Sequence, residues 1–94
     1  MLAVADGEIL EAIGITARLG GVFGEPAGVA GVAGLRRGRK SGVIGSGETV
    51  LVVITGNGLK DIGSARRAVG DPISITPDMS SLQRALSESG VTLP

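Results

Sequence analysis

The sequence predicts an α/β fold, in which a partial parallel or mixed sheet is flanked by helices. Residues 49–54 form an uncharged, mostly β-branched run, which is typical of a strand buried on both faces. A turn cluster at residues 55–58 follows directly, and apolar residues recur at helical spacing on either side of it in the chain. With 94 residues, 43% apolar and 19% charged, the chain is expected to form a single domain, residues 1–94.

The first helix is expected to begin at Asp6, because an aspartate side chain can cap the free N–H groups of a first turn. Ile9, Ile13 and Ala17 then lie on one apolar face. The glycine pair at residues 20–21 predicts its end.

A second helix is expected from Pro26, which suits a first helical position because its missing N–H needs no partner there. Residues 27–35 repeat as AGV, AGV and AGL. Each glycine costs a helix about 1 kcal/mol relative to alanine, so we expect a neighbour to cross this helix very close to its backbone. Residues 36–48 are predicted to be a basic, glycine-rich connection.

The C-terminal third is expected to hold less regular structure. Residues 61–69 form either a short helix or an irregular turn, and residues 73–75 are a candidate edge strand. A last helix is predicted to start at residues 76–78, to bury Leu86 on its apolar face and to stop at Gly90.

The composition excludes several classes of chemistry. There is no cysteine and no histidine, which removes thiol catalysis, disulfides, the usual zinc sites and Ser-His-Asp catalysis. The formal net charge is zero, so neither nucleic acid nor an anionic membrane is an expected partner. No signal peptide or membrane-spanning run is evident, and we expect a cytoplasmic protein without a metal site.

The apolar residues are small, because Phe23 is the single aromatic residue and 17 residues are glycine. Such side chains bury little area each, and at roughly 25 cal/mol per Å² they leave a thin margin over chain entropy. We therefore expect a partner, which is either further polypeptide from the N-terminal side or a second copy of the chain.

Two segments invite a phosphate-binding interpretation. The basic cluster at residues 36–40 is interpreted first as a solvated loop after a helix, and second as a phosphate or partner contact. Residues 42–49 approach the P-loop pattern, but Glu48 replaces the lysine and would repel phosphates. We interpret residues 42–49 as a flexible connection.

Two candidate site positions remain. Thr55 begins the turn beyond the predicted strand, where open α/β sheets bind ligands, although by spacing alone residues 56–58 are equally an ordinary turn. Glu25 is either a helix-initiating acid or a partly buried functional carboxylate.

Two motifs carry a resemblance to a known family. Residues 21–30 (GVFGEPAGVA) and residues 52–61 (VVITGNGLKD) resemble segments from the C-terminal part of threonine synthases. Threonine synthases belong to the tryptophan-synthase-β-like, fold-type-II enzymes that use pyridoxal 5'-phosphate (PLP). The resemblance covers most of residues 4–86.

The resemblance implies a piece of the fold-type-II fold, from a lyase of threonine biosynthesis that converts O-phosphohomoserine and water to threonine and phosphate. It places the Thr55 hydroxyl against the pyridine nitrogen of PLP and puts Glu25 near the cofactor. The Schiff-base lysine and the phosphate loop of the family lie upstream, and neither Lys40 nor Lys60 matches that lysine. No catalytic residue is therefore expected in this chain, which alone should bind no PLP and be inactive.

Two alternatives stay open. One is a stand-alone oligomeric binding module derived from this family. The other is a fragment of a threonine or serine dehydratase, against which residues 58–61 (GLKD) argue.

Overall fold

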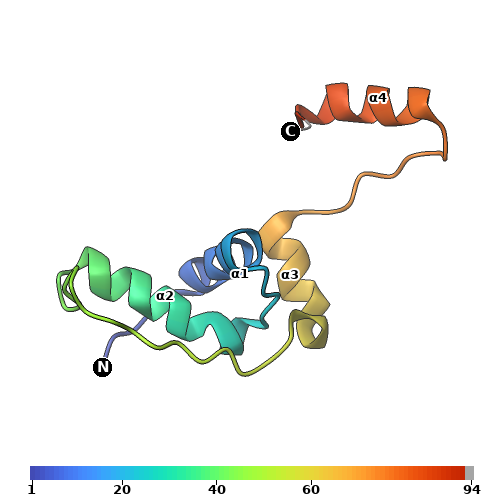
Figure 1. Cartoon of the computed structure of the whole chain (residues 1–94). Helices are drawn as coiled ribbons and strands as arrows, with labels where there is room; N and C mark the ends of the chain where they lie inside the picture. Colours follow the sequence, from blue (N-terminus) through green and yellow to red (C-terminus); the bar gives the residue numbers. More distant parts are fainter. Residues whose placement is uncertain (93–94) are drawn as a thin grey trace.

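The computed structural model describes residues 1–92, and this part of the chain is helical, without a single strand (Figure 1). The elements are the helices α1 (Asp6–Gly20), α2 (Pro26–Lys40), α3 (Ile62–Val69) and α4 (Met79–Ser89), with a 3₁₀ helix, η1 (Gly58–Asp61), before α3. The predicted α/β fold with a partial parallel or mixed sheet, as a piece of the fold-type-II fold, is therefore wrong.

Helix α1 has the predicted extent but a different cap. Its N-cap is Ala5, and Asp6 is the first helical residue. The Glu8 carboxylate accepts a hydrogen bond of 2.7 Å from the Ala5 N–H, which satisfies one free donor of the first turn. The helix ends where predicted, because Gly21 adopts the left-handed conformation (φ 64°) and its N–H donates to Ala17.

Helix α2 begins at Pro26 as predicted but continues to Lys40, so the basic cluster lies on the helix. A Cβ added to Gly28 would lie 3.0 Å from the main-chain N and O of Gly56. A Cβ added to Gly31 would lie 3.2 Å from Val52, whereas one at Gly34 would meet nothing within 4 Å. The predicted close approach is confirmed at two of the three glycines, and the neighbour is the extended segment 52–56.

The predicted strand 49–54 is extended but unpaired, and it runs alongside α2 (Figure 1). Within residues 1–92, the β-bridge between Gly24 and Asn57 is isolated and belongs to no strand. Residues 73–75 are likewise irregular. A β-branched run becomes a strand only when a second backbone supplies a hydrogen-bonding ladder, and α2 offers side chains to this segment instead.

The C-terminal elements follow the prediction more closely. Residues 61–69 resolve into the end of η1 and helix α3. Helix α4 starts after Asp78, whose carboxylate accepts a hydrogen bond of 2.7 Å from Ser81, and it stops at Gly90 (φ 66°).

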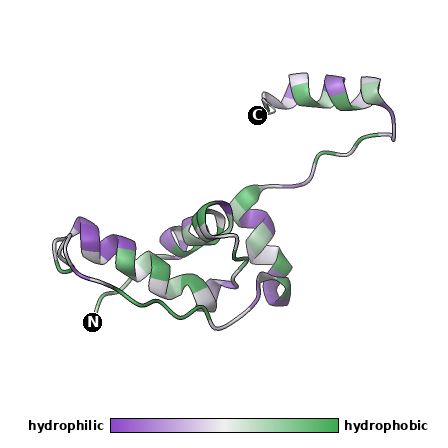
Figure 2. Ribbon diagram, in the orientation of Figure 1, coloured by the Kyte–Doolittle hydropathy of each residue, from purple (hydrophilic) through white to green (hydrophobic). Residues whose placement is uncertain are grey.

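The core lies between α1 and α2 and consists of small residues, as expected from the composition. Its buried members are Ala12, Ile13, Val29 and Ala33. Helix α3 packs beside α1, whereas α4 lies apart at the end of an extended linker (Figures 1 and 2). The radius of gyration is 16.6 Å. A compact chain of this length has about 12 Å, so the molecule is elongated.

Candidate functional site

The two sequence motifs meet at the N-terminal end of α2. The Glu25 N–H donates a hydrogen bond of 2.9 Å to the Gly56 carbonyl, and the Gly58 N–H donates one of 2.9 Å to the Phe23 carbonyl. These two bonds fix the loop 55–58 against the segment that leads into α2. Residues more than 30 positions apart in the sequence therefore form one structural unit.

Glycine at position 56 is required by the Glu25 side chain. A Cβ on Gly56 would overlap the Glu25 carboxylate, which therefore lies directly over the backbone of the loop. The Glu25 side chain is 18% exposed, and its Oε1 lies 3.2 Å from Nζ of Lys60, which is 68% exposed. Glu25 is thus the partly buried carboxylate considered above, and sequence spacing contained no signal that Lys60 is its partner.

Gly58 is required for a similar reason, because a Cβ at this position would overlap the ring of Phe23. The side chain of Asn57 accepts a hydrogen bond of 2.9 Å from the Leu59 N–H and so caps η1. The GNG sequence therefore serves a tight turn between an extended segment and a helix.

Thr55 is exposed at the start of this loop. Among the described residues, its hydroxyl takes part in no hydrogen bond, and its main-chain N faces Gly28 on α2. The hydroxyl is therefore available both as a donor and as an acceptor. The main chain that carries it is held by the bonds to Glu25 and Phe23 described above.

Asp61 ends the same motif and caps α3. Its carboxylate accepts hydrogen bonds from the Ser64 hydroxyl at 2.7 Å and from the Ser64 N–H at 3.0 Å. These bonds, the hydroxyl first, lower the pKa of Asp61 below its ordinary value, although slight desolvation opposes them. Asp61 is therefore ionised at neutral pH and has a structural role.

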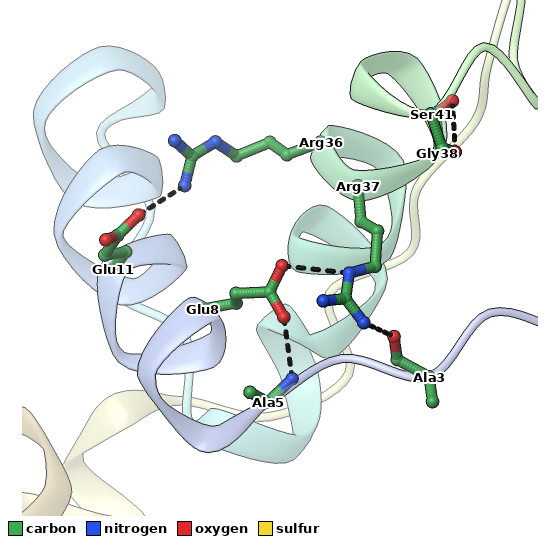
Figure 3. Close-up of polar contacts among 8 residues, drawn as sticks. All are labelled: Ala3, Ala5, Glu8, Glu11, Arg36, Arg37, Gly38 and Ser41. Atoms are coloured by element: carbon green, nitrogen blue, oxygen red, sulfur yellow. Dashed lines mark hydrogen bonds and ion pairs between the residues drawn. The ribbon is translucent and has the colours of Figure 1, made fainter.

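The basic cluster 36–40 joins α2 to α1 and its N-terminal segment (Figure 3). Arg36 lies 2.9 Å from Glu11, and Arg37 lies 3.1 Å from Glu8 and also donates to the Ala3 carbonyl. The interpretation as a solvated loop is therefore wrong. These two arginines are paired with acids of α1 because α2 continues through them, which the glycine repeat had concealed.

The near P-loop at residues 42–49 is a small turn of another kind. The Glu48 carboxylate accepts a hydrogen bond from the Gly45 N–H, and Arg39 donates to the Gly45 carbonyl. The glutamate thus occupies the main-chain N–H that a phosphate would need, in agreement with our rejection of a nucleotide loop. A hollow of ≈ 690 Å³ beside it is lined by Leu35, Arg36, Arg39, Lys40, Glu48 and Val50, away from Thr55.

Two further searches gave negative results over residues 1–92. No three potential metal-binding side chains of the described residues come together. No described helix combines the length and apolar character that crossing a membrane requires.

The fold and the site define a helical segment whose specialised part is one loop, held rigidly at the start of a glycine-rich helix. No family model matches the chain. Individual relatives do match. The chain is 44% identical to a threonine synthase of Methanocaldococcus jannaschii over 86 residues, which are 92% of this chain and 21% of the relative.

Threonine synthases of Halalkalibacterium halodurans and Synechocystis sp. match in the same way. The first is 45% identical over 75 residues, 80% of this chain and 21% of the relative. The second is 42% identical over 85 residues, 88% of this chain and 22% of the relative. The chain thus spans about a fifth of the length of these relatives. The resemblance carried by residues 21–30 and 52–61 is confirmed: the chain is related to threonine synthases and corresponds to their C-terminal part.

Proposed function

We propose that this chain supplies the cofactor-facing loop of a PLP-dependent threonine synthase of the cytoplasm, with the Thr55 hydroxyl hydrogen-bonded to the pyridine nitrogen. The match to the M. jannaschii enzyme carries this proposal, because 92% of the chain necessarily includes both motifs. The reaction would convert O-phosphohomoserine and water to threonine and phosphate.

The residues around Thr55 suit the pyridine side of PLP. A ring nitrogen needs one hydrogen-bonding group at a fixed position, and Thr55 offers an exposed hydroxyl on a loop fixed by two main-chain bonds. Glu25 lies close by, but Lys60 neutralises its charge. When bound, PLP supplies an electron sink for carbanion chemistry.

The chain's own contribution is to orient the ring. A neutral hydroxyl does not hold a proton on the pyridine nitrogen as an aspartate would, so Thr55 would keep the ring a moderate electron sink. Glu25 and Lys60 would act one step away, by holding Gly56 and hence Thr55 in place. Neither lysine of the chain is proposed as the covalent anchor, which would come from the N-terminal part of the enzyme, and the isolated chain is proposed to be inactive.

A chimeric enzyme tests this proposal. The matching 86 residues of the M. jannaschii threonine synthase would be replaced by those of this chain, and release of phosphate and threonine from O-phosphohomoserine would be measured. We expect activity in the chimera. Thr55→Val should lower kcat about 10-fold or more and shift the visible absorption of the cofactor, because loss of one transition-state hydrogen bond has this order of effect.

Thr55→Ser is the matched control, because it keeps the hydroxyl and should retain most of the activity. Equal activity and equal absorption in the Val and Ser variants would contradict the role of the hydroxyl. A chimera that releases ammonia from threonine or serine, but no phosphate from O-phosphohomoserine, would support the dehydratase alternative instead.

A further inference from the structure

Residues 49–55 expose an unpaired edge of the backbone. Among residues 1–92, no hydrogen bond engages the main-chain N–H or C=O groups of this segment. Its side chains alternate: Leu51 (88% exposed) and Val53 (68% exposed) face solvent, whereas Val52 and Ile54 face α2 and its approach. The segment is the long apolar stretch on the outer side of α2 (Figure 2). It therefore has strand geometry without a strand partner.

The sequence of this segment is nearly the same in both directions. It is TVLVVIT, with Val52 at the centre. In an antiparallel pair of two copies centred on Val52, Thr49 lies opposite Thr55, Val50 opposite Ile54 and Leu51 opposite Val53. Every cross-strand pair joins residues of the same kind, and no charge is placed opposite another.

We propose that residues 49–55 are a homodimerisation strand, which pairs antiparallel with the same segment of a second copy about a twofold axis at Val52. Pairing gives the unpaired N–H and C=O groups of the segment partners, and it covers Leu51 and Val53 partly with the same residues of the other copy. The ladder forms between two chains and leaves the helical fold of each chain unchanged.

A second copy fits this edge for two reasons. A twofold interface needs a surface that complements itself, and the near-palindrome provides this complementarity along the whole segment. The formal net charge of zero also means that two copies do not repel each other at neutral pH. The inference rests on this segment alone and does not require the proposed function.

Two double variants at the exposed positions test both the surface and its register. Leu51→Lys/Val53→Lys places like charges opposite each other at both Leu51–Val53 pairs. Leu51→Lys/Val53→Glu removes the same two apolar side chains but places opposite charges there. In sedimentation equilibrium from micromolar to millimolar concentration, we expect a dimer of the unmodified chain. The Lys/Lys variant should dissociate about 10-fold or more readily than the Lys/Glu variant, in line with measured cross-strand charge effects.

Other outcomes would overturn the proposal. They are a monomer at every concentration, a dimer that neither variant weakens, which would place the interface elsewhere, or equal weakening by both variants, which would exclude the antiparallel register. Fibrils in place of a closed dimer would also overturn it. Because the chain lacks cysteine, Val52→Cys offers an independent readout: mild oxidation should cross-link two copies, whereas Val69→Cys on the exposed surface of α3 should not.

Discussion

At the scale of single residues, the defining feature is how closely backbone segments approach each other around the site loop. Gly28 lets the backbone at residue 56 approach α2, and Gly56 leaves room for the Glu25 carboxylate. Both glycines are therefore explained by contact and not by a special backbone angle, because neither has a positive φ. The loop is placed by absent side chains as much as by hydrogen bonds.

Alanine substitutions at two glycines of α2 should have opposite effects. Gly34→Ala should stabilise the chain by about 0.5–1 kcal/mol, because nothing lies near the added methyl and alanine favours the helix. Gly28→Ala should leave the chain at least about 1 kcal/mol less stable than Gly34→Ala, because its methyl meets main-chain atoms that are held by a hydrogen bond. Urea unfolding followed by far-UV circular dichroism measures both. Equal stabilisation by the two substitutions would show that the loop moves away at little cost.

At the scale of elements, α4 differs from the other helices because little besides its own cap supports it. The Asp78 carboxylate accepts hydrogen bonds from the Ser80 hydroxyl, the Thr76 hydroxyl and the Ser81 N–H. These bonds lower its pKa from 3.8 to about 2. An 11-residue helix is marginal in water, so the ionised cap is a major determinant of its helicity.

The helicity of α4 should therefore depend on acid. A carboxyl group with a lowered pKa stabilises the folded form above its unfolded pKa, and this contribution is lost as the pH falls from about 3.8 to about 2. Backbone chemical shifts of Ser80 and Ser81 should report loss of helix over this range. Asp78→Asn keeps a good N-cap without titrating, so its α4 should change little there. A parallel loss in both proteins would assign the transition to another group.

At the scale of the whole molecule, the core and α4 are separate. The residues packed on the core are Val4, Ile9, Leu10, Val32, Ile54 and Ala68, so no residue beyond 71 takes part. The ion pairs of Arg36 and Arg37 add to the same helix pair, but they are partly exposed and contribute no more than about 1 kcal/mol each. Stability is thus concentrated in the α1–α2 crossing.

Removal of α4 should leave this crossing intact. A chain that ends at Asp71 should unfold in urea with the same free energy, within about 0.5 kcal/mol, because α4 contributes nothing to the core. Ile13→Ala, at a side chain that is 2% exposed, should instead cost about 2–4 kcal/mol. Destabilisation by the truncation as large as that of Ile13→Ala would show that α4 packs on the body in solution.

The helices were predictable because their signals are local. Pro26 at a helix start, Gly21 at a helix end and the last helix between Asp78 and Gly90 depend on residues within a turn of one another. The family was predictable for the same reason, because its motifs are short and contiguous. The extent of α2 was missed because its glycines obscure the helical pattern that its arginines continue.

The sequence by itself determined the helix boundaries, the thin core and the relationship to threonine synthases, through local propensity and contiguous motifs. Only the tertiary structure decided that residues 49–54 lack a sheet, that Lys60 neutralises Glu25 and that the basic cluster binds α1. These features depend on which backbone or charge lies opposite a residue in space. Composition and spacing describe the segment itself and contain no information about that partner.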